Sequence, residues 1–352
     1  MDCCRSVPDS RSHRHFAASP RSAPPRPHPN RSGSAHLTLP AVSVCVPLRN
    51  EQEALPLLLA ALARLDLPRV RLATFFLLDS CTDGSDRVLR RAAPSFPHPM
   101  TIARIGPSAD ANAGRARRAA IALGLDHARS SPDGILLSTD ADSEPRSDWV
   151  RAAVRGLALA DVVAGRVVRS AADRDVNQSK VEAYFDRLHA LRRAIDPVPW
   201  DTPIGSHHSG AANLGIKVDV YEQLGGFKPL RSGEDAVLID DASRAGMRVR
   251  RDPSMVVETS SRRDGRAPGG LAAALREIDG QGLPNIAHPA ATVWQYRLQA
   301  DARRVFGVID DRRAVAGFGE LVGLSPDHVI GVARDCPNAE AFAMRIVPAA
   351  PF

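Results

Sequence analysis

The feature that most constrains this chain is residues 135–143, an apolar run that ends abruptly in two carboxylates. Residues 135–139 have the length and composition of a buried strand, and Asp140 and Asp142 follow with one alanine between them. Because ligands bind outside the carboxyl ends of the strands in an open α/β sheet, we expect both carboxylates at the rim of a cleft. They could supply hard oxygen ligands to Mg²⁺ or Mn²⁺ there. The alternative is an acidic turn that caps a helix starting near Ser147.

Apolar runs that predict strands alternate along the chain with segments that have the periodicity of amphipathic helices. This alternation predicts the α/β class, with a mixed but mostly parallel sheet covered by helices on both faces. The chain beyond Gly270 is predicted to be helical and contains no recognisable motif. The predicted strands are residues 39–47, 70–78, 100–105, 135–139, 161–168 and 247–257, and the predicted helices are residues 53–65, 86–93, 115–129, 148–159, 177–195, 218–224 and one that ends near residue 245.

Residues 1–38 are predicted to be a disordered basic tail. Up to His36 they hold six arginines and two aspartates, which leaves 40 basic and 38 acidic residues for the rest of the chain. The net charge of +6 is therefore weak evidence for nucleic acid, and we expect no nucleic-acid partner. The tail is also compatible with an organelle-targeting peptide or with a start codon assigned too far upstream.

Length and composition allow a sizeable core, since 44% of the 352 residues are hydrophobic. No apolar run approaches the roughly 18 residues that span a bilayer, so we expect no transmembrane segment, while peripheral membrane contact stays open. The five cysteines show no paired spacing, which is typical of a reducing compartment and predicts a cytoplasmic location.

Polar or acidic clusters stand at the ends of at least three predicted strands, and a parallel sheet would bring these ends to one edge. Motifs of small residues, which let the backbone approach a ligand closely, follow later in the chain. In chain order the motifs are Pro47-x-Arg49-Asn50-Glu51, Asp79-x-x-x-Asp83-Gly84-Ser85, Asp140-Ala141-Asp142, Gly210-Ala211-Ala212-Asn213, Gly225-Gly226-Phe227 and Gly233-Glu234-Asp235.

This order of motifs, from about residue 42 to 263, resembles that of the family 2 glycosyltransferases. The resemblance implies the GT-A fold and the use of a nucleotide-diphosphate sugar as donor. It implies a GT-A domain over residues 39–268, with a nucleotide-binding half at about 39–145 and an acceptor half at about 146–268. Residues 269–352 would then form a helical C-terminal extension.

By position in the motifs, the resemblance implies roles for single residues on the donor side. Asp142 is similar to the family's ligand for Mg²⁺ or Mn²⁺, which bridges to the diphosphate. His207 is a candidate further ligand, with Glu258 as its competitor and an ordinary loop histidine as the alternative. The residues implied to contact the nucleotide sugar are Pro47, Arg49, Glu51, Asp79, Gly114, Arg118 and Asp140.

On the acceptor side, the resemblance implies that Asp235 is the catalytic base and that Glu234 binds the acceptor beside it. Gly210, Ala211 and Asn213 match the segment between donor sugar and acceptor. A carboxylate at a helix start can deprotonate an attacking hydroxyl, and a divalent cation can neutralise a departing diphosphate. We therefore expect a single displacement that inverts the anomeric centre. The alternative is that Glu234 and Asp235 only cap their helix.

Two departures from the family pattern narrow the prediction. One carboxylate of the usual Asp-Asp-Gly-Ser is missing at Asp79-Ser80-Cys81-Thr82, and the Gln-x-x-Arg-Trp motif typical of processive polymer synthases is absent. We therefore expect transfer of a single sugar to an acceptor hydroxyl, with the sugar, base and acceptor unidentified. The alternatives are a GT-A-shaped nucleotide-binding or scaffold protein without turnover, and a sugar nucleotidyltransferase, which would need a glycine-rich phosphate loop after the first strand.

Overall fold

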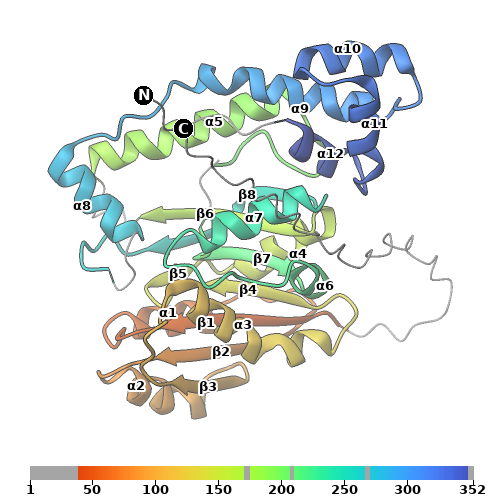
Figure 1. Ribbon diagram of the computed structural model, residues 1–352. Helices are drawn as coiled ribbons and strands as arrows, with labels where there is room; N and C mark the ends of the chain where they lie inside the picture. The colour runs from red at the N-terminus through yellow and green to blue at the C-terminus, as the bar shows by residue number, and fades with distance from the viewer. Residues whose placement is uncertain (1–38, 170–174, 207–209, 266–269, 348–352) are drawn as a thin grey trace, which may run out of the picture. The chain divides into compact units, whose positions relative to one another are not determined.

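The computed structural model describes residues 39–169, 175–206, 210–265 and 270–347, so the predicted basic tail and His207 lie outside the described residues (Figure 1). The described part of the chain contains one eight-stranded sheet with helices packed around it. The strands are β1 (Ala41–Leu48), β2 (Arg71–Asp79), β3 (Met100–Ile105), β4 (Ile135–Thr139), β5 (Ser143–Pro145), β6 (Val162–Arg169), β7 (Asn213–Lys217) and β8 (Val249–Thr259).

Helices follow most of these strands, and Asn112 caps α3 by accepting a hydrogen bond from Arg115 N at 2.8 Å. Among the described residues, no helix combines the length and the apolar character that a membrane crossing needs. The α-helices are α1 (Leu55–Ala63), α2 (Ser85–Ala92), α3 (Ala113–Arg129), α4 (Trp149–Leu159), α5 (Val176–Ile195), α6 (Val218–Gln223), α7 (Glu234–Arg244), α8 (Leu271–Gln281), α9 (Val293–Phe306), α10 (Arg312–Val322), α11 (Pro326–Arg334) and α12 (Ala339–Ile346).

The sheet is mixed, with the strand order β3-β2-β1-β4-β7-β6-β8-β5. Strands β1 to β4 are parallel to their neighbours in one half, and β6 pairs parallel with β8 in the other. Strand β7 runs antiparallel to both β4 and β6, and β5 pairs antiparallel with β8. The parallel half therefore places the carboxyl ends of β1, β2 and β4 at one edge, where a ligand site is expected.

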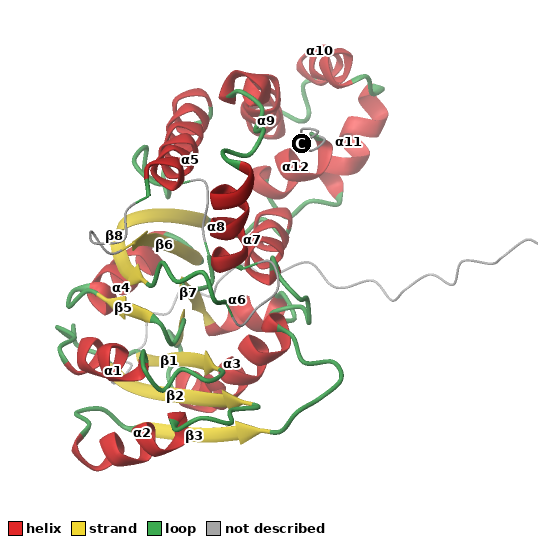
Figure 2. Ribbon diagram, turned by 90° about the vertical axis from the view of Figure 1, so that its left-hand side faces the viewer, coloured by secondary structure: helices red, strands yellow, loops and turns green. Residues whose placement is uncertain are grey.

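Alternating side chains give the sheet two buried faces. Val44 of β1 belongs to a core cluster that includes residues of α1, α2 and α4. Its neighbour Cys45 belongs to a second cluster, formed with residues of α3, α6 and α7. Figure 2 shows the strands between these two helical layers. The predicted α/β class, with a mixed sheet covered on both faces, is confirmed.

Helices α9 to α12 have a core of their own, which includes Val315, Phe318 and Phe342. Helix α12 packs against α7, and α9 packs against α5. Arg303 of α9 strengthens this junction because it forms ion pairs with Asp196 and Glu340. The helical region predicted after Gly270 is confirmed, whereas the domain boundaries stay a prediction.

Strands β5 and β7 were not predicted from the sequence, in which β7 starts at the last residue of the small-residue motif Gly210-Ala211-Ala212-Asn213. Gly215 interrupts the apolar pattern of β7, yet a β-carbon there would lie only 3.1 Å from Leu137 Cδ2. The glycine thus lets β7 pack closely against its neighbours, but it weakens the sequence pattern that would predict a strand here. Pairing with β4 and β6 supplies the strand conformation, and that pairing cannot be read from local composition.

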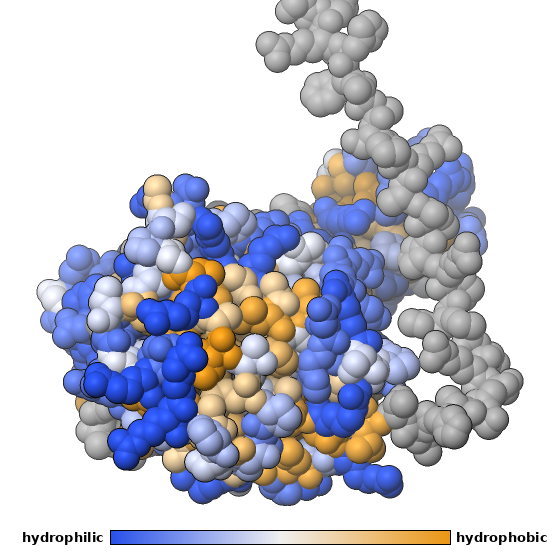
Figure 3. All heavy atoms as spheres, turned by 90° about the horizontal axis from the view of Figure 1, so that it is seen from below, coloured by the Kyte–Doolittle hydropathy of each residue, from blue (hydrophilic) through white to orange (hydrophobic). Residues whose placement is uncertain are grey.

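Strand β3 is an edge of the sheet, on the face seen from below. Apolar surface gathers on this face between hydrophilic side chains (Figure 3). Ile102 and Ile105 of β3 are only partly buried. The exposed Arg104 between them pairs with Asp86 at 3.4 Å, and such a charge protects an edge strand from pairing with other chains.

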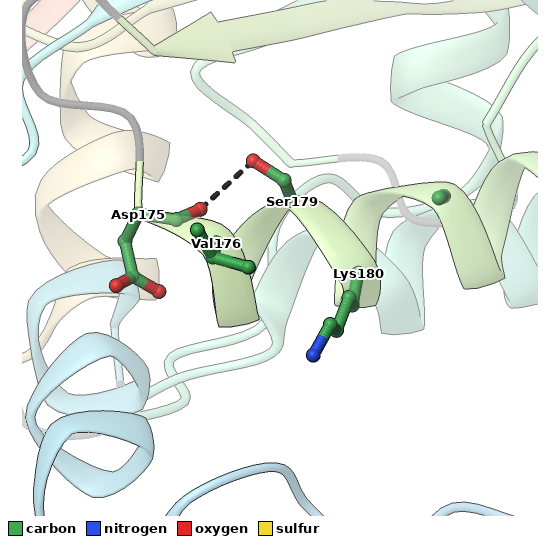
Figure 4. A pocket seen from close by; sticks show the side chains of 5 residues that line it. Asp175, Val176, Ser179 and Lys180 are labelled. Atoms are coloured by element: carbon green, nitrogen blue, oxygen red, sulfur yellow. Dashed lines mark hydrogen bonds between the residues drawn. The ribbon is translucent and has the colours of Figure 1, made fainter.

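The first turn of α5 borders a surface pocket (Figure 4). Asp175 caps this helix, since its carboxylate accepts a hydrogen bond from Gln178 N at 2.9 Å. Ser179 Oγ donates to the carbonyl of Asp175 at 2.8 Å, as the dashed line shows. Val176 and Lys180 complete most of the lining, so this pocket contains none of the predicted site residues.

Candidate active site

The candidate site lies where β1, β2 and β4 end, and hydrogen bonds tie the loops there together. Asn50 follows β1 with a left-handed φ of 55° and accepts a hydrogen bond through Oδ1 from Thr82 N at 2.8 Å. Glu51 N donates to Ser85 Oγ at 2.9 Å, which fixes the backbone of this residue. The side chain of Glu51 is buried, so its carboxylate needs a partner close by.

Three of the predicted nucleotide contacts occupy the same edge of the sheet. Pro47 is in β1, in register with Leu77, and Arg49 is exposed just beyond the end of that strand. Asp79 ends β2 and is buried, and its Oδ1 accepts a hydrogen bond from Ser80 Oγ at 2.8 Å. Contact of these residues with a nucleotide stays a prediction.

Arg117 of α3 joins the two halves of the site, and the sequence analysis did not identify it. Its Nη2 lies 2.9 Å from Asp140 Oδ1, and its Nε lies 3.2 Å from Glu234 Oε1. Its Nη1 donates to Ser138 Oγ at 3.0 Å and to the carbonyl of Ala211 at 3.3 Å. Burial by itself would lower the pKa of Arg117, but the two carboxylates outweigh it and raise the pKa. The buried guanidinium therefore stays charged and connects the end of β4 with the start of α7.

Gly114 and Arg118, the predicted nucleotide contacts on α3, have structural contacts, and their contact with a nucleotide stays a prediction. A β-carbon on Gly114 would lie 2.0 Å from the carbonyl oxygen of Lys228, so only glycine lets α3 approach that segment. Arg118 Nη1 donates to the carbonyl of Phe227 at 3.3 Å. The arginine that reaches Asp140 is thus Arg117, one residue earlier. A sequence signal for it existed, because Arg117 falls on the buried stripe of an alanine-rich helix.

Asp142 and Glu51 share the guanidinium of Arg262, which lies in the loop after β8. Arg262 Nη1 donates to Glu51 Oε2 at 2.5 Å, and Nη2 donates to Glu51 Oε1. The same Nη2 lies 3.1 Å from Asp142 Oδ2. Burial, with further contributions from Asp140 and Glu51, raises the pKa of Asp142 to about 6 although Arg262 opposes the shift. The charged form of Asp142 is therefore disfavoured, first by burial and then by the neighbouring negative charges.

The charges at this edge suit a divalent cation. With all groups ionised, two negative charges remain uncompensated among four carboxylates and two guanidinium groups, which are Glu51, Asp140, Asp142, Glu234, Arg117 and Arg262. No three His, Cys, Asp or Glu side chains in the described ranges are arranged to hold a metal. Mg²⁺ is usually bound by one or two carboxylates together with substrate phosphates. The residues present therefore fit a cation that takes its other ligands from a diphosphate.

The other two candidate ligands are His207 and Glu258. His207 lies outside the described residues. Glu258 is an exposed residue of β8, in register with Glu144 of β5. Metal ligation by His207 or Glu258 stays a prediction.

The raised pKa of Asp142 predicts that the metal-free protein loses stability as the pH rises. The folded state binds this proton more tightly than the unfolded chain, whose aspartate pKa is near its ordinary value of 3.8. The stabilisation is therefore complete below about pH 4 and is lost as the pH rises to about 6. The expected loss is on the order of 2–3 kcal/mol in the free energy of unfolding, and Asp142→Asn should abolish it. Urea denaturation across this pH range, with a chelator present, measures the effect, and parallel profiles for wild type and variant would contradict it.

Asp235 lies in the first turn of α7, after Gly233, whose φ of 74° is left-handed. Its Oδ2 accepts a hydrogen bond from Ala211 N at 2.8 Å, and its Oδ1 accepts one from Ala236 N at 2.7 Å. Gly210 is adjacent, because a β-carbon there would lie 3.6 Å from Asp235 Oδ2. The structure thus brings Gly210, Ala211 and Asp235 together, with Glu234 beside them on Arg117. A role for Asp235 as base stays a prediction.

Asn213 was predicted to bind the acceptor, and its position corrects that prediction. The residue is fully buried in β7. Its Nδ2 donates to the carbonyls of Arg166 and Met255, both at 2.8 Å, and its Oδ1 accepts from Trp149 Nε1 at 2.8 Å. The amide therefore joins β6, β8 and α4 inside the protein and is shielded from any acceptor. The sequence gives no sign of this, because the three partners are distant along the chain.

Replacing Asn213 by leucine is expected to lower the free energy of unfolding by about 2–4 kcal/mol, because three buried polar groups lose their partner. Asn112→Ala, which removes the cap of α3, is the comparison and should cost about 1 kcal/mol. Urea denaturation of both variants measures the difference. If Asn213→Leu were as stable as the wild type and had a raised KM for the acceptor, the acceptor-binding role of Asn213 would be restored.

No family model and no curated protein sequence matches this chain. The chain is similar in structure to S. aureus TarS in complex with UDP-GlcNAc, with a TM-score of 0.46 and 14% identity over 86% of this chain and 89% of that one. It is similar to the mannosyltransferase PcManGT of Pyrobaculum calidifontis in complex with GDP-Man and Mn²⁺, with a TM-score of 0.47 and 17% identity over 88% and 86%. For glucosyl-3-phosphoglycerate synthase of Mycobacterium tuberculosis the TM-score is 0.41, with 17% identity over 70% and 81%. Because all three TM-scores lie below 0.5, we base the functional proposal on the site residues.

Proposed function

We propose that this protein is a GT-A glycosyltransferase that moves one sugar from a nucleotide-diphosphate sugar to an acceptor hydroxyl. The observation that carries the proposal is the guanidinium of Arg117, which contacts Asp140 at the end of β4 and Glu234 at the start of α7. This buried contact joins a donor-side carboxylate to the turn that holds Asp235. A carboxylate turn that served only as a helix cap would not need such a connection.

Asp142 would hold Mg²⁺ or Mn²⁺ on the donor side, and Asp140 would contact the nucleotide sugar beside it. The cation, when bound, supplies Lewis-acid neutralisation of the charge that develops on the departing diphosphate. Asp142 is oriented for this role by its own backbone, since its carbonyl accepts a hydrogen bond from Ser260 N at 3.2 Å. The buried Glu51 and Asp79, at the ends of β1 and β2, border the place where the nucleotide would lie.

Asp235 would act on the acceptor side. Ala211 N holds its Oδ2, which fixes the orientation of the carboxylate relative to the segment at Gly210. As the acceptor oxygen bonds to the anomeric carbon, Asp235 takes the hydroxyl proton, and the bond from that carbon to the diphosphate oxygen breaks. Attack opposite the leaving group inverts the anomeric centre.

The test is release of nucleoside diphosphate from a panel of UDP-, GDP- and other nucleotide sugars with Mn²⁺, in the presence of a mixture of hydroxyl-bearing acceptors. We expect release from donors of one base, dependent on Mn²⁺ and on Asp235. Tight nucleotide binding without any release would favour the scaffold protein. Formation of a nucleotide sugar from a sugar phosphate and a nucleoside triphosphate would favour the nucleotidyltransferase.

A further inference from the structure

Arg262 bridges two carboxylates that come from different strands. It makes two hydrogen bonds to Glu51, after β1, and one ion pair of 3.1 Å to Asp142, after β4. Glu51 is 6% exposed, and the hydrogen bonds from Arg262 to it raise the pKa of the arginine. A guanidinium therefore lies against the carboxylate to which the proposed function assigns a divalent cation.

The backbone near Arg262 is fixed to the same strand end. Ser260 N donates to the carbonyl of Asp142 at 3.2 Å, and Ser143 pairs in register with Thr259. The hydroxyls of Ser143 and Thr259 also form a hydrogen bond of 3.2 Å. Because these contacts hold the base of the loop, the contact between Arg262 and Asp142 can change by rotation of the side chain alone.

We propose that Arg262 is an internal counter-ion that a divalent cation displaces from Asp142, so that this side chain sets the cation affinity of the site. This inference rests on the proposed function, because it takes Asp142 as the cation ligand. It assigns to the loop after β8 a role in regulating the donor site.

Electrostatics makes the two positive charges competitors. A cation on Asp142 would lie close to the guanidinium, and like charges at such distances repel strongly away from bulk water. Arg262 can keep the hydrogen bond from Nη1 to Glu51 Oε2 when Nη2 leaves Asp142, so the exchange does not leave the half-buried arginine without a partner. Asp142 is neutralised by a positive partner both before and after the exchange.

The test is the affinity of the purified protein for Mn²⁺ alone, measured by the loss of the free Mn²⁺ signal in electron paramagnetic resonance. Arg262→Gln removes the charge and retains a polar side chain, and Arg262→Lys retains the charge. The matched control is Arg263→Gln, which removes an equal charge at the next residue of the loop. The side chain of Arg263 pairs with Asp279 at 2.8 Å. Asp142→Asn, alone and combined with Arg262→Gln, identifies the binding carboxylate.

We expect Arg262→Gln to bind Mn²⁺ at least about tenfold more tightly than wild type, because a unit charge about 4 Å away at an effective dielectric constant of about 20 is worth more than that factor. Arg262→Lys and Arg263→Gln should stay within about threefold of wild type, since both leave a positive charge near Asp142. Equal Asp142-dependent affinity in wild type and Arg262→Gln would overturn this proposal and leave the proposed function standing. Absence of Asp142-dependent Mn²⁺ binding in every variant would also overturn this proposal, whereas the proposed function is tested separately by the release of nucleoside diphosphate.

Discussion

Asp235→Asn is expected to lower kcat by about 100- to 10,000-fold, the range that a positioned general base contributes. The amide has the shape of the carboxylate and can still accept the hydrogen bond that Asp235 Oδ2 receives from Ala211 N. It cannot take the proton of the acceptor hydroxyl. Donor affinity should therefore stay close to that of wild type while turnover falls. Steady-state kinetics with the donor found in the panel, together with a binding titration of the same donor, separates the two quantities.

Asp240→Asn is the matched control for this prediction. Asp240 lies on the same helix, α7, and forms an exposed i, i+4 ion pair of 2.5 Å with Arg244. Loss of an exposed pair costs little, so both turnover and stability should change only slightly. Wild-type turnover of Asp235→Asn would remove the base role from this residue, as would a product that keeps the anomeric configuration of the donor.

Arg117→Met is expected to lower the free energy of unfolding by about 3–5 kcal/mol, because it leaves a buried carboxylate without its positive partner. Glu234 is 5% exposed and depends on Arg117 Nε at 3.2 Å. Methionine fills much of the same volume, so the loss reports charge rather than a cavity. Urea denaturation at neutral pH measures the effect.

The neighbouring substitution Arg118→Met is the control. It shows whether the destabilisation by Arg117→Met comes from the lost contact with Glu234 or from the loss of any positive charge on α3. Arg118 makes one hydrogen bond, to the carbonyl of Phe227 at 3.3 Å, so its loss should cost about 1 kcal/mol. Equal destabilisation by the two substitutions would contradict the view that Arg117 is the buried link between the two halves of the site.

Much of the fold could be predicted because the strands of the parallel half are continuous apolar runs with clear stop signals. Residues 100–105 and 135–139 were predicted with the bounds that the structure shows. The Asp-x-Asp motif was placed correctly at a strand end for the same reason. Strand β7 escaped prediction because it is short, contains Gly215 and is stabilised by pairing with β4 and β6.

The parts of the site that sequence reasoning missed are contacts between distant segments. Arg262 meets Glu51 across more than half of the chain, and no local pattern relates them. Arg117 was detectable as a charge on a buried helical stripe, yet motif position favoured Arg118. Asn213 was assigned to an acceptor because its motif is near Asp235, whereas the side chain points into the core. Motif position identified the right segments, and side-chain direction depended on packing.

The most direct test of the nucleotide-sugar site is thermal stabilisation by a panel of nucleoside diphosphates, each with and without Mn²⁺, for wild type and Asp142→Asn. A ligand that binds only the folded state raises the apparent stability by about 2.7 kcal/mol at a hundred times its Kd. We predict that one nucleotide raises the Tm of wild type, that the rise requires Mn²⁺, and that Asp142→Asn abolishes it. No rise in Tm with any nucleotide would contradict the assignment of this sheet edge as a nucleotide-diphosphate site.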